Sequence, residues 1–403
     1  MNEEHRPAMP QLAGAPAPHT AGPVERVARI ADVIAASGAR NEALRRLAPE
    51  VVDALHEQRI FRLLLARAFG GEEVDLPTWF ATMEALGKLD ASTAWCVGQI
   101  NGCAAAATSL DPAVARKIWG EPRGALSWGP PVKSRAEEAD GGHRVSGEWT
   151  MSSGSRHATW IGLMAATFDR AGAPVALPPG AAMRVFLVPA ATVAFIENWN
   201  VIGLIATNSG GFKVENVLVP HGHSVYLPFP RSPATAGPLS RFPLNNLFGI
   251  GFTGVALGIA RAMMDIVIAL ARDKKPWLAK QALHESGLAQ FQIGEAEARL
   301  RSARSYIELT AQRVWESVLA SGELTVAQRM DIRLATTFAI HEAKAVAEAA
   351  WDIAGASAIF TTNPLERRLR DIHTLTQQLQ GRKSHLQDVG AYLLGLEPNL
   401  RHA

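Results

Sequence analysis

A serine-rich segment in the middle of the chain is the first place where side chains could do chemistry. Residues 149–155 contain Ser152, Ser153 and Ser155 within four positions. A serine becomes a nucleophile when a sharp strand-to-helix turn exposes it and a histidine and a carboxylate activate it. The glycine pattern of such a turn is missing here, and no histidine and carboxylate partners are suggested. The segment therefore argues against a hydrolase.

A second pattern that could belong to a functional site lies at residues 249–254, which match the string G-x-G-x-x-G. A dinucleotide-binding turn with this string needs a buried strand before it and a β-α-β unit around it. Residues 244–247 do not form such a strand, and helical sequence follows helical sequence afterwards. We interpret the glycines as points of close helix packing, so the chain has no nicotinamide site of its own.

The histidines and cysteines do not indicate a metal centre. His221 and His223 have a spacing that could hold a metal ion, but no nearby carboxylate or cysteine completes the ligand set. A solvated loop is the better interpretation. The chain has two cysteines, Cys96 and Cys103, in an apolar, alanine-rich stretch, where we expect small buried side chains and neither a disulfide scaffold nor a zinc site.

The composition is that of an ordinary globular protein. The 403 residues are 48% hydrophobic and carry a formal net charge of +2, with no dense basic run of the kind that grips nucleic acid. The longest apolar stretch, 249–271, is interrupted by Arg261 and Asp265, and the N-terminus has no signal-peptide pattern. We expect a cytoplasmic protein with neither a membrane nor a nucleic-acid partner.

Three blocks of different periodicity must position any site. After a proline-rich segment at 1–23, which we expect to be a flexible tail, residues 24–120 have helical periodicity. Residues 121–243 contain short β-rich runs, including 183–188 and 212–219, with a predicted hairpin turn at Gly141 and Gly142. Residues 244–403 predict a bundle of four long antiparallel helices near 248–272, 282–320, 325–355 and 365–394. The fold class is α+β, mostly α.

This order of blocks, together with several sequence segments, resembles the acyl-CoA dehydrogenase superfamily. The most specific segment is 141–154, with its Trp-x-Met-Ser-Ser-Gly end. The others are Gly70-Gly71 with 86–95, the run 199–220 with its Thr-x-Ser and Val-x-Val-Pro elements, and 363–371 with its Arg-Asp end. Together these segments span almost everything after the tail.

Within the superfamily, the missing catalytic base separates the branches. The common dehydrogenase branch uses a glutamate eight residues after the Arg-Asp aspartate, and that position holds Leu379. Asp388 is the only acid in 372–396, so a thioester dehydrogenase or desaturase would need a relocated base. A scaffold protein that kept the fold and lost turnover is a further alternative.

The 149–154 loop instead resembles that of oxygenase components of two-component flavin monooxygenases. Such enzymes accept reduced FMN or FAD from a separate NAD(P)H-dependent reductase, add O2 at flavin C4a, and deliver the distal oxygen of the hydroperoxide to a small organic substrate. The resemblance leaves FMN and FAD undecided. It also implies a homotetramer or a homodimer.

The resemblance also implies which residues meet the flavin. Ser153 takes the place of the loop hydroxyl beside flavin N5, and Ser127 lies where a second hydroxyl donor is expected. Trp128 and Trp149 either wall the ring or fill the β core. Phosphate contacts are expected near 272–277, at a close-packed turn around 354–357, and often across a subunit interface. The predicted cofactor contacts are Trp128, Trp149, Met151, Ser152, Ser153, Lys274, Lys275 and Gly355.

The chain departs from the phenol hydroxylases of this group at two histidine positions. Gln378 stands where a histidine seven residues after Asp371 is usual, and Asn101 replaces the other substrate-side histidine. An amide anchors a substrate by hydrogen bonding but is no general base near neutral pH. We therefore expect an amine, an indole-like ring, a sulfur atom or an electrophilic group to be oxygenated. His157 is a candidate replacement proton carrier, with loop structure as the alternative.

Overall fold

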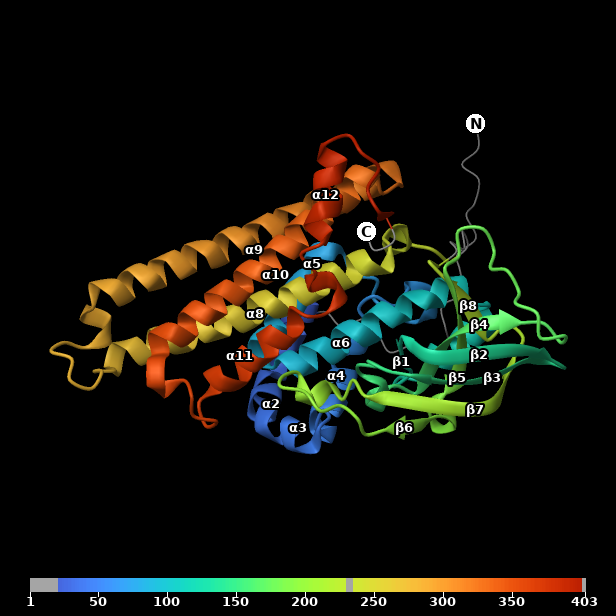
Figure 1. The fold of residues 1–403 in the computed structure, drawn as a ribbon, viewed down its shortest axis with the longest axis horizontal. Helices are drawn as coiled ribbons and strands as arrows, with labels where there is room; N and C mark the ends of the chain where they lie inside the picture. The colour runs from blue at the N-terminus through green and yellow to red at the C-terminus, as the bar shows by residue number, and fades with distance from the viewer. Residues whose placement is uncertain (1–20, 230–234, 401–403) are drawn as a thin grey trace.

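The computed structural model of the chain describes residues 21–229 and 235–400. The predicted tail therefore falls mostly outside the described residues, and the first helix begins at Pro23. Figure 1 shows a helical bundle at one end of the molecule and a β sheet at the other, with helix α6 running between them. The class α+β, mostly α, is confirmed.

The first block is helical, as predicted. Asp90 separates its two longest helices, because its side chain accepts hydrogen bonds from Thr93 N and Thr93 Oγ1 and so starts a new helix. Asp111 caps the next helix in the same way, with Pro112 in the first turn. The helices are α1 (Pro23–Arg29), α2 (Ala31–Ala36), α3 (Gly38–Leu44), α4 (Pro49–Glu57), α5 (Leu76–Leu89), α6 (Ala91–Ala104) and α7 (Pro112–Trp119).

The middle block forms a sheet with the strand order β6-β7-β3-β2-β4-β5-β8, and β1 pairs in parallel with the first half of β4. The predicted hairpin is present, since Gly141 at φ +80° turns β2 into β3. The strands are β1 (Leu126–Gly129), β2 (Pro131–Ala139), β3 (Gly142–Trp149), β4 (Trp160–Phe168), β5 (Met183–Pro189), β6 (Ala194–Ile196), β7 (Gly211–Pro220) and β8 (Ser224–Leu227).

The C-terminal block packs three long helices, α8 (Leu244–Asp273), α9 (Gly287–Ser321) and α10 (Val326–Ala354), with α5 against α8. Helix α8 is long and apolar enough to cross a membrane by composition, but 67% of its most apolar window is buried inside the protein. It is the core helix of the bundle. Close packing at the 249–254 glycines is confirmed, because a Cβ built on Gly251 would lie 2.8 Å from the Trp79 ring.

The last predicted helix, 365–394, is two helices, α11 (Pro364–Leu375) and α12 (His385–Leu393). The chain leaves the helix at Thr376, whose hydroxyl donates to His373 O, and Gln378 Oε1 then accepts from Gln380 N. Such side-chain bonds to the backbone compete with the helical ladder. The break places Gln378 in a connecting turn, directly before a short 3-10 helix, η10 (Leu379–Gly381).

Candidate active site

The 150–154 loop is anchored from three directions. Ser152 Oγ donates to Gly210 O at 2.7 Å, and Ser127 Oγ, on β1, donates to Ser153 O at 2.7 Å. Gly154 has φ +72° and lies against α6, so that a Cβ there would be 3.3 Å from the Ile100 side chain. The loop is therefore held between α6, the first strand and the start of β7.

A line of hydrogen bonds leads away from the Ser153 hydroxyl. Trp95 Nε1, on α6, donates to Ser153 Oγ at 3.0 Å. Ser153 Oγ lies 2.5 Å from Ser209 Oγ, which lies 2.7 Å from Thr207 Oγ1. Thr207 Oγ1 donates to Leu204 O at 2.7 Å. All three hydroxyl groups belong to buried residues.

Helix α11 holds the far end of this line. Asp371 Oδ1 accepts from Leu204 N at 2.6 Å, and a Cβ on Gly203 would lie 2.2 Å from Arg370 O. Only a glycine allows this close approach of loop and helix. Burial raises the pKa of the Asp371 carboxyl to about 7, against the opposing effect of the Leu204 hydrogen bond.

An aromatic stack supports Trp95 from the other side. The Trp95 and Phe252 rings are 3.9 Å apart at 12°, and Phe248 continues the stack at 5.5 Å from Phe252. Gly98 and Gly102 on α6 make room for these rings, because a Cβ on Gly102 would lie 2.2 Å from Phe248 Cε1. Helices α6 and α8 thus fix the indole that donates to Ser153.

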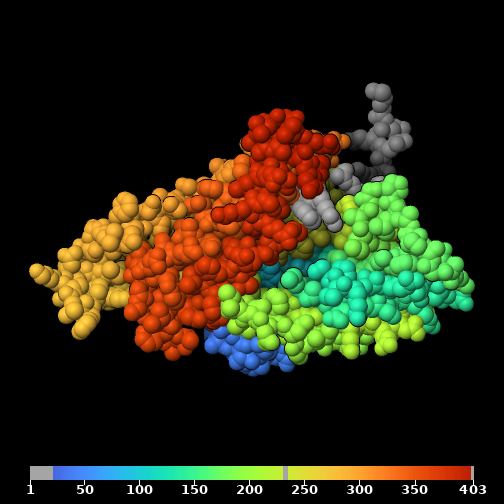
Figure 2. Space-filling view, in the orientation of Figure 1, coloured from blue at the N-terminus to red at the C-terminus, as the bar shows by residue number. Residues whose placement is uncertain are grey.

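A hollow lies above this region of α6. Figure 2 shows it between the red segments at the end of the chain and the green β domain, with segments in the blue-green colour of α6 at its floor. The η10 segment contacts α8 and α10. Segments of the β domain and of the C-terminal block therefore flank this hollow.

The predicted ring contacts divide into exposed and buried groups. Met151 is 63% exposed and has φ +49° in the turn, whereas Ser152 is buried. Trp149 is fully buried in the β core, where its Nε1 donates to Met164 O and its ring stacks on Phe212. Trp128 is also buried, 6.1 Å from the Phe229 ring. Both tryptophans are thus packed in hydrophobic clusters of the structure.

Asn101 and His157 are also occupied by the backbone. Asn101 Oδ1 accepts from Leu64 N, and its Nδ2 donates to Ile60 O and Val97 O, in a fully buried position. His157 Nε2 accepts from Leu47 N at 3.3 Å. Burial lowers the pKa of His157 to about 4, so the ring is neutral near pH 7. Both side chains therefore hydrogen-bond to the backbone of segments that are distant in the sequence.

Gln378 differs from Asn101 because it keeps a free donor. Its Oε1 caps η10 through Gln380 N at 3.0 Å. Its Nε2 is buried and has no hydrogen-bond partner among the described residues. A buried donor without a partner costs stability and needs an explanation, such as a ligand that accepts from it.

The two predicted phosphate regions come together at the far end of the bundle. Lys274 Nζ donates to Ala354 O at 2.6 Å and to Ser357 Oγ at 2.9 Å, beside Gly355 with φ +53°. Lys274 therefore also caps the end of α10, while Lys275 is exposed. Phe252 lies 22 residues before Lys274, which is about 33 Å along the axis of α8. The lysines are thus remote from Ser153 within one chain.

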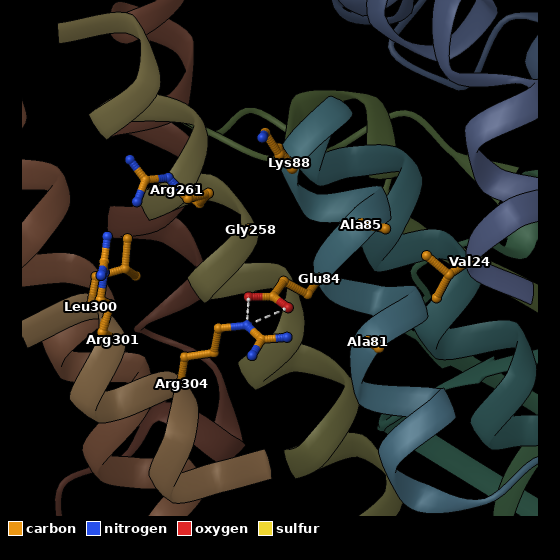
Figure 3. A pocket seen from close by; sticks show the side chains of 10 residues that line it. All are labelled: Val24, Ala81, Glu84, Ala85, Lys88, Gly258, Arg261, Leu300, Arg301 and Arg304. Atoms are coloured by element: carbon orange, nitrogen blue, oxygen red, sulfur yellow. Dashed lines mark hydrogen bonds and ion pairs between the residues drawn. The ribbon is translucent and has the colours of Figure 1, made fainter. Parts of the chain in front are cut away.

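A separate cavity of about 360 Å³ lies between α5, α8 and α9 (Figure 3). Arg304 and Glu84 face one another across it, with Arg304 Nε 2.9 Å from Glu84 Oε1. The other cations are paired as well, Lys88 and Arg261 with Asp265, and Arg301 with Glu297. Because each positive charge has a carboxylate partner, this cavity does not suit a flavin phosphate.

The structure also shows the surroundings of the cysteines and of Asp388. Both cysteines are free and buried, and burial raises the pKa of each thiol. The described residues hold no group of three side chains suited to a metal ion. Asp388, considered as a relocated base, pairs with the buried Arg333 at 2.8 Å. That carboxylate therefore already has a structural partner.

Sequence reasoning missed four residues of the site, namely Trp95, Thr207, Ser209 and Asp371. Each stood within a segment that carried the family resemblance. The Thr-x-Ser element was the visible signal for two of them, although the backbone there is not extended, since Thr207 ends a 3-10 helix and Asn208 has φ +36°. The pairing of Ser209 with Ser153, 56 residues away, had no sequence signal.

A reduced flavin fits the donor set of the site. Ser153 Oγ can accept a further hydrogen bond, and Gln378 Nε2 is a buried donor without a partner among the described residues. The cations predicted for the flavin phosphates, Lys274 and Lys275, follow the distal end of α8.

The fold is acyl-CoA dehydrogenase-like, with helical, β and helical blocks in that order. Residues 250–380 match the family model for the acyl-CoA dehydrogenase C-terminal domain. In overall fold, XiaF from Streptomyces sp., solved in complex with FADH2 and glycerol, has a TM-score of 0.87 at 24% identity, covering 94% of this chain and 96% of that chain.

Curated relatives identify the branch. Indole-3-acetate monooxygenase of Pseudomonas putida is 29% identical over 88% of this chain and 89% of its own length. The oxygenase component of FADH(2)-dependent resorcinol hydroxylase from Rhizobium sp. (strain MTP-10005) is 28% identical over 97% and 99%. The predictions of an oxidoreductase, of a flavin-dependent monooxygenase oxygenase component, and of reduced flavin with O2 are confirmed.

Proposed function

We propose that reduced flavin binds with its ring against the 150–154 loop and with N5 beside Ser153 Oγ. The observation that carries this proposal is the fixed position of that oxygen, which Trp95 and Ser209 hold from the side while Ser127 holds the serine carbonyl. Groups held in advance, in a site that excludes water, stabilise developing charge better than mobile ones. Bound reduced flavin supplies the electrons that activate O2, and one oxygen atom passes to the substrate.

Gln378 is the proposed substrate anchor. Its free Nε2 suits a carbonyl, carboxylate or other acceptor on a small organic substrate. Neither of the other two predicted substrate-side groups supplies a base, because Asn101 is an amide bound to the backbone and His157 is neutral. We favour a substrate whose reacting atom needs no deprotonation, such as an indole-like ring, an amine or a sulfur atom. The name of the Pseudomonas relative, an indole-3-acetate monooxygenase, agrees with the first of these.

The active form is proposed to be a homodimer or a homotetramer in which each flavin uses two copies of the chain. Lys274, Lys275 and Gly355 are about 33 Å along α8 from the Trp95 stack, farther than a flavin phosphate extends from its ring. A second copy would bring these groups to the phosphate end. A separate NAD(P)H-dependent reductase would supply the reduced flavin, and FMN and FAD are both candidates.

The test is to mix the protein with chemically reduced FMN or FAD and then with O2, following absorbance. We expect a transient spectrum that differs from both reduced and oxidised flavin. Ser153→Ala should shorten its lifetime by about tenfold or more, as the loss of one hydrogen bond to the reacting group does. Ser155→Ala, at a buried neighbour whose hydroxyl group pairs with Ser152 Oγ, is the matched control.

Two outcomes would contradict the proposal. If no transient forms and an acyl thioester bleaches bound FAD, the chain is a dehydrogenase. If the protein responds to no flavin in any state, the binding-scaffold alternative holds. Native mass spectrometry with each flavin would identify the preferred cofactor.

A further inference from the structure

The hydrogen-bond line at Ser153 has a fixed direction, because its two ends have fixed roles. The indole Nε1 of Trp95 can only donate, and the carbonyl oxygen of Leu204 can only accept. Three hydroxyl groups lie between these ends, each with one hydrogen. The four bonds are all filled only if Ser153 donates to Ser209, Ser209 to Thr207, and Thr207 to Leu204 O.

This direction leaves Ser153 without a hydrogen for any other partner. A serine hydroxyl has one hydrogen and two lone pairs. In the filled line its hydrogen points to Ser209, and one lone pair accepts from Trp95. The remaining lone pair is the only feature of Ser153 Oγ that a ligand can meet. A group that offers a hydrogen is attracted there, and a group that offers a lone pair is repelled.

The surrounding fold opposes reversal of the line. Reversal would leave Thr207 Oγ1 and Leu204 O in contact at 2.7 Å without a hydrogen between them. Leu204 O would keep Trp199 Nε1 and Thr207 N as donors, but its lone pairs would face those of Thr207 Oγ1. Because Thr207 and Ser209 are buried, water cannot easily relieve that contact. Asp371 holds Leu204 N, and the close contact of Gly203 with Arg370 O keeps the loop against α11. The Leu204 carbonyl therefore stays where the line needs its acceptor.

We propose that this directed line makes the enzyme select reduced over oxidised flavin, with Ser209 and Thr207 as its positioning residues. The proposal rests on the proposed function, in which N5 faces Ser153. Reduced flavin carries a hydrogen on N5 and can donate to Ser153 Oγ. Oxidised flavin carries a lone pair on N5, which faces the lone pair of Ser153. An oxygenase component that receives reduced flavin from another protein gains from this preference, because spent flavin leaves the site.

The first test compares the dissociation constants of reduced and oxidised FMN or FAD, measured without O2. Ser209→Ala frees the Ser153 hydrogen to point at oxidised N5. Thr207→Val lets Ser209 donate back to Ser153, with the same result. For both variants we expect oxidised flavin to bind about tenfold tighter, with reduced flavin nearly unchanged, because one buried hydrogen bond has about this value.

Two further variants separate the effect of the hydrogen-bond direction from the effect of removing any buried hydroxyl group. Thr207→Ser keeps the terminal hydroxyl and should restore the original preference. Ser155→Ala removes a buried hydroxyl that lies outside the line and should leave the preference unchanged. If folded Ser209→Ala and Thr207→Val both keep the preference of the unmodified protein, the inference is wrong while the proposed function stands. If the unmodified protein does not bind reduced flavin, the proposed function fails first.

A second measurement needs neither flavin nor a variant. Neutron diffraction from deuterated crystals of the unmodified protein locates hydroxyl hydrogens that ordinary X-ray data do not show. We expect the deuterium between Ser153 and Ser209 to be bonded to Ser153 Oγ. Deuterium bonded to Ser209 Oγ at that contact would overturn the inference.

Discussion

At the scale of single residues, the polar side chains of this site differ in which of their hydrogen-bonding atoms have no partner. Asn101 and Gln378 are both amides at predicted substrate positions, yet Asn101 is committed to Leu64, Ile60 and Val97. Gln378 uses only its oxygen and leaves Nε2 without a partner among the described residues. Residue type alone did not separate the two, because the difference depends on the backbone groups that each amide meets.

Gln378→Glu should test the free donor. The variant keeps an oxygen to cap η10 but replaces Nε2 with a second acceptor. For a substrate that accepts from Gln378, we expect KM to rise about tenfold while the transient seen without substrate is unchanged. Gln377→Ala, at an exposed neighbour, is the control. An unchanged KM for every turned-over substrate would remove Gln378 from the binding site.

At the scale of elements, small residues on α6 and α8 set how closely the helices approach. Gly98 and Gly102 face the rings of Phe252 and Phe248, and these rings support the indole of Trp95. Glycine weakens a helix when it is exposed, but at these positions a side chain has no room. The same residue type is therefore expected to have opposite effects at different helical positions.

A pair of glycine substitutions tests this difference. Gly102→Ala should destabilise the protein by about 1–3 kcal/mol, because its Cβ would lie 2.2 Å from Phe248 Cε1. Gly294→Ala, in α9 with no atom within 4 Å of the new Cβ, should stabilise it by roughly 0.5–1 kcal/mol. Thermal unfolding measures both changes. Equal shifts in the same direction would contradict the packing argument.

The contact between α11 and the loop at Leu204 should make stability depend on pH. Burial raises the pKa of Asp371 from 3.8 to about 7, so the folded state holds its proton more tightly than the unfolded state. This contribution to stability is complete below pH 4 and is lost as pH rises through about 7.

We therefore expect the protein to lose roughly 2 kcal/mol of stability relative to Asp371→Asn between pH 5 and pH 8. Asparagine does not titrate but can still accept from Leu204 N. Denaturant unfolding of both proteins across this range measures the difference. Parallel curves at all pH values would show that the buried carboxyl does not titrate in this window.

At the scale of the whole molecule, the two groups of predicted flavin contacts lie far apart in the folded subunit. The 150–154 loop packs on α6 beside the β sheet, whereas Lys274 and Lys275 follow the last turn of α8 (Figure 1). A flavin that uses both groups needs two copies. This arrangement makes subunit mixing a direct test of the proposed oligomer.

Copies carrying Ser153→Ala and copies carrying Lys275→Glu should each be defective as pure oligomers. After dissociation and random reassembly at equal amounts, about a quarter of the sites should combine an intact loop with an intact lysine. Activity should recover to that fraction. Lys280→Glu, an exposed charge reversal in the same connection, should need no partner to function. No recovery in stable mixed oligomers would place all flavin contacts within one chain.

The sequence by itself determined the order of the blocks, the hairpin at Gly141, the packing role of the 249–254 glycines and the family. These features depend on local periodicity, turn chemistry and short motifs, which neighbouring residues carry. The break in the last helix after Leu375 is also a local feature, but the sequence did not predict it. There Thr376 and Gln378 turn the backbone with their own side chains.

Only the tertiary structure decided which candidate side chains are available. It buried Trp149, satisfied Asn101, kept His157 neutral and left Gln378 Nε2 free. It also joined Trp95, Ser153, Ser209 and Thr207, which come from three separate segments, into one directed line. Hydrogen-bond partners and burial depend on residues far apart in the chain, so no local pattern in the sequence could specify them.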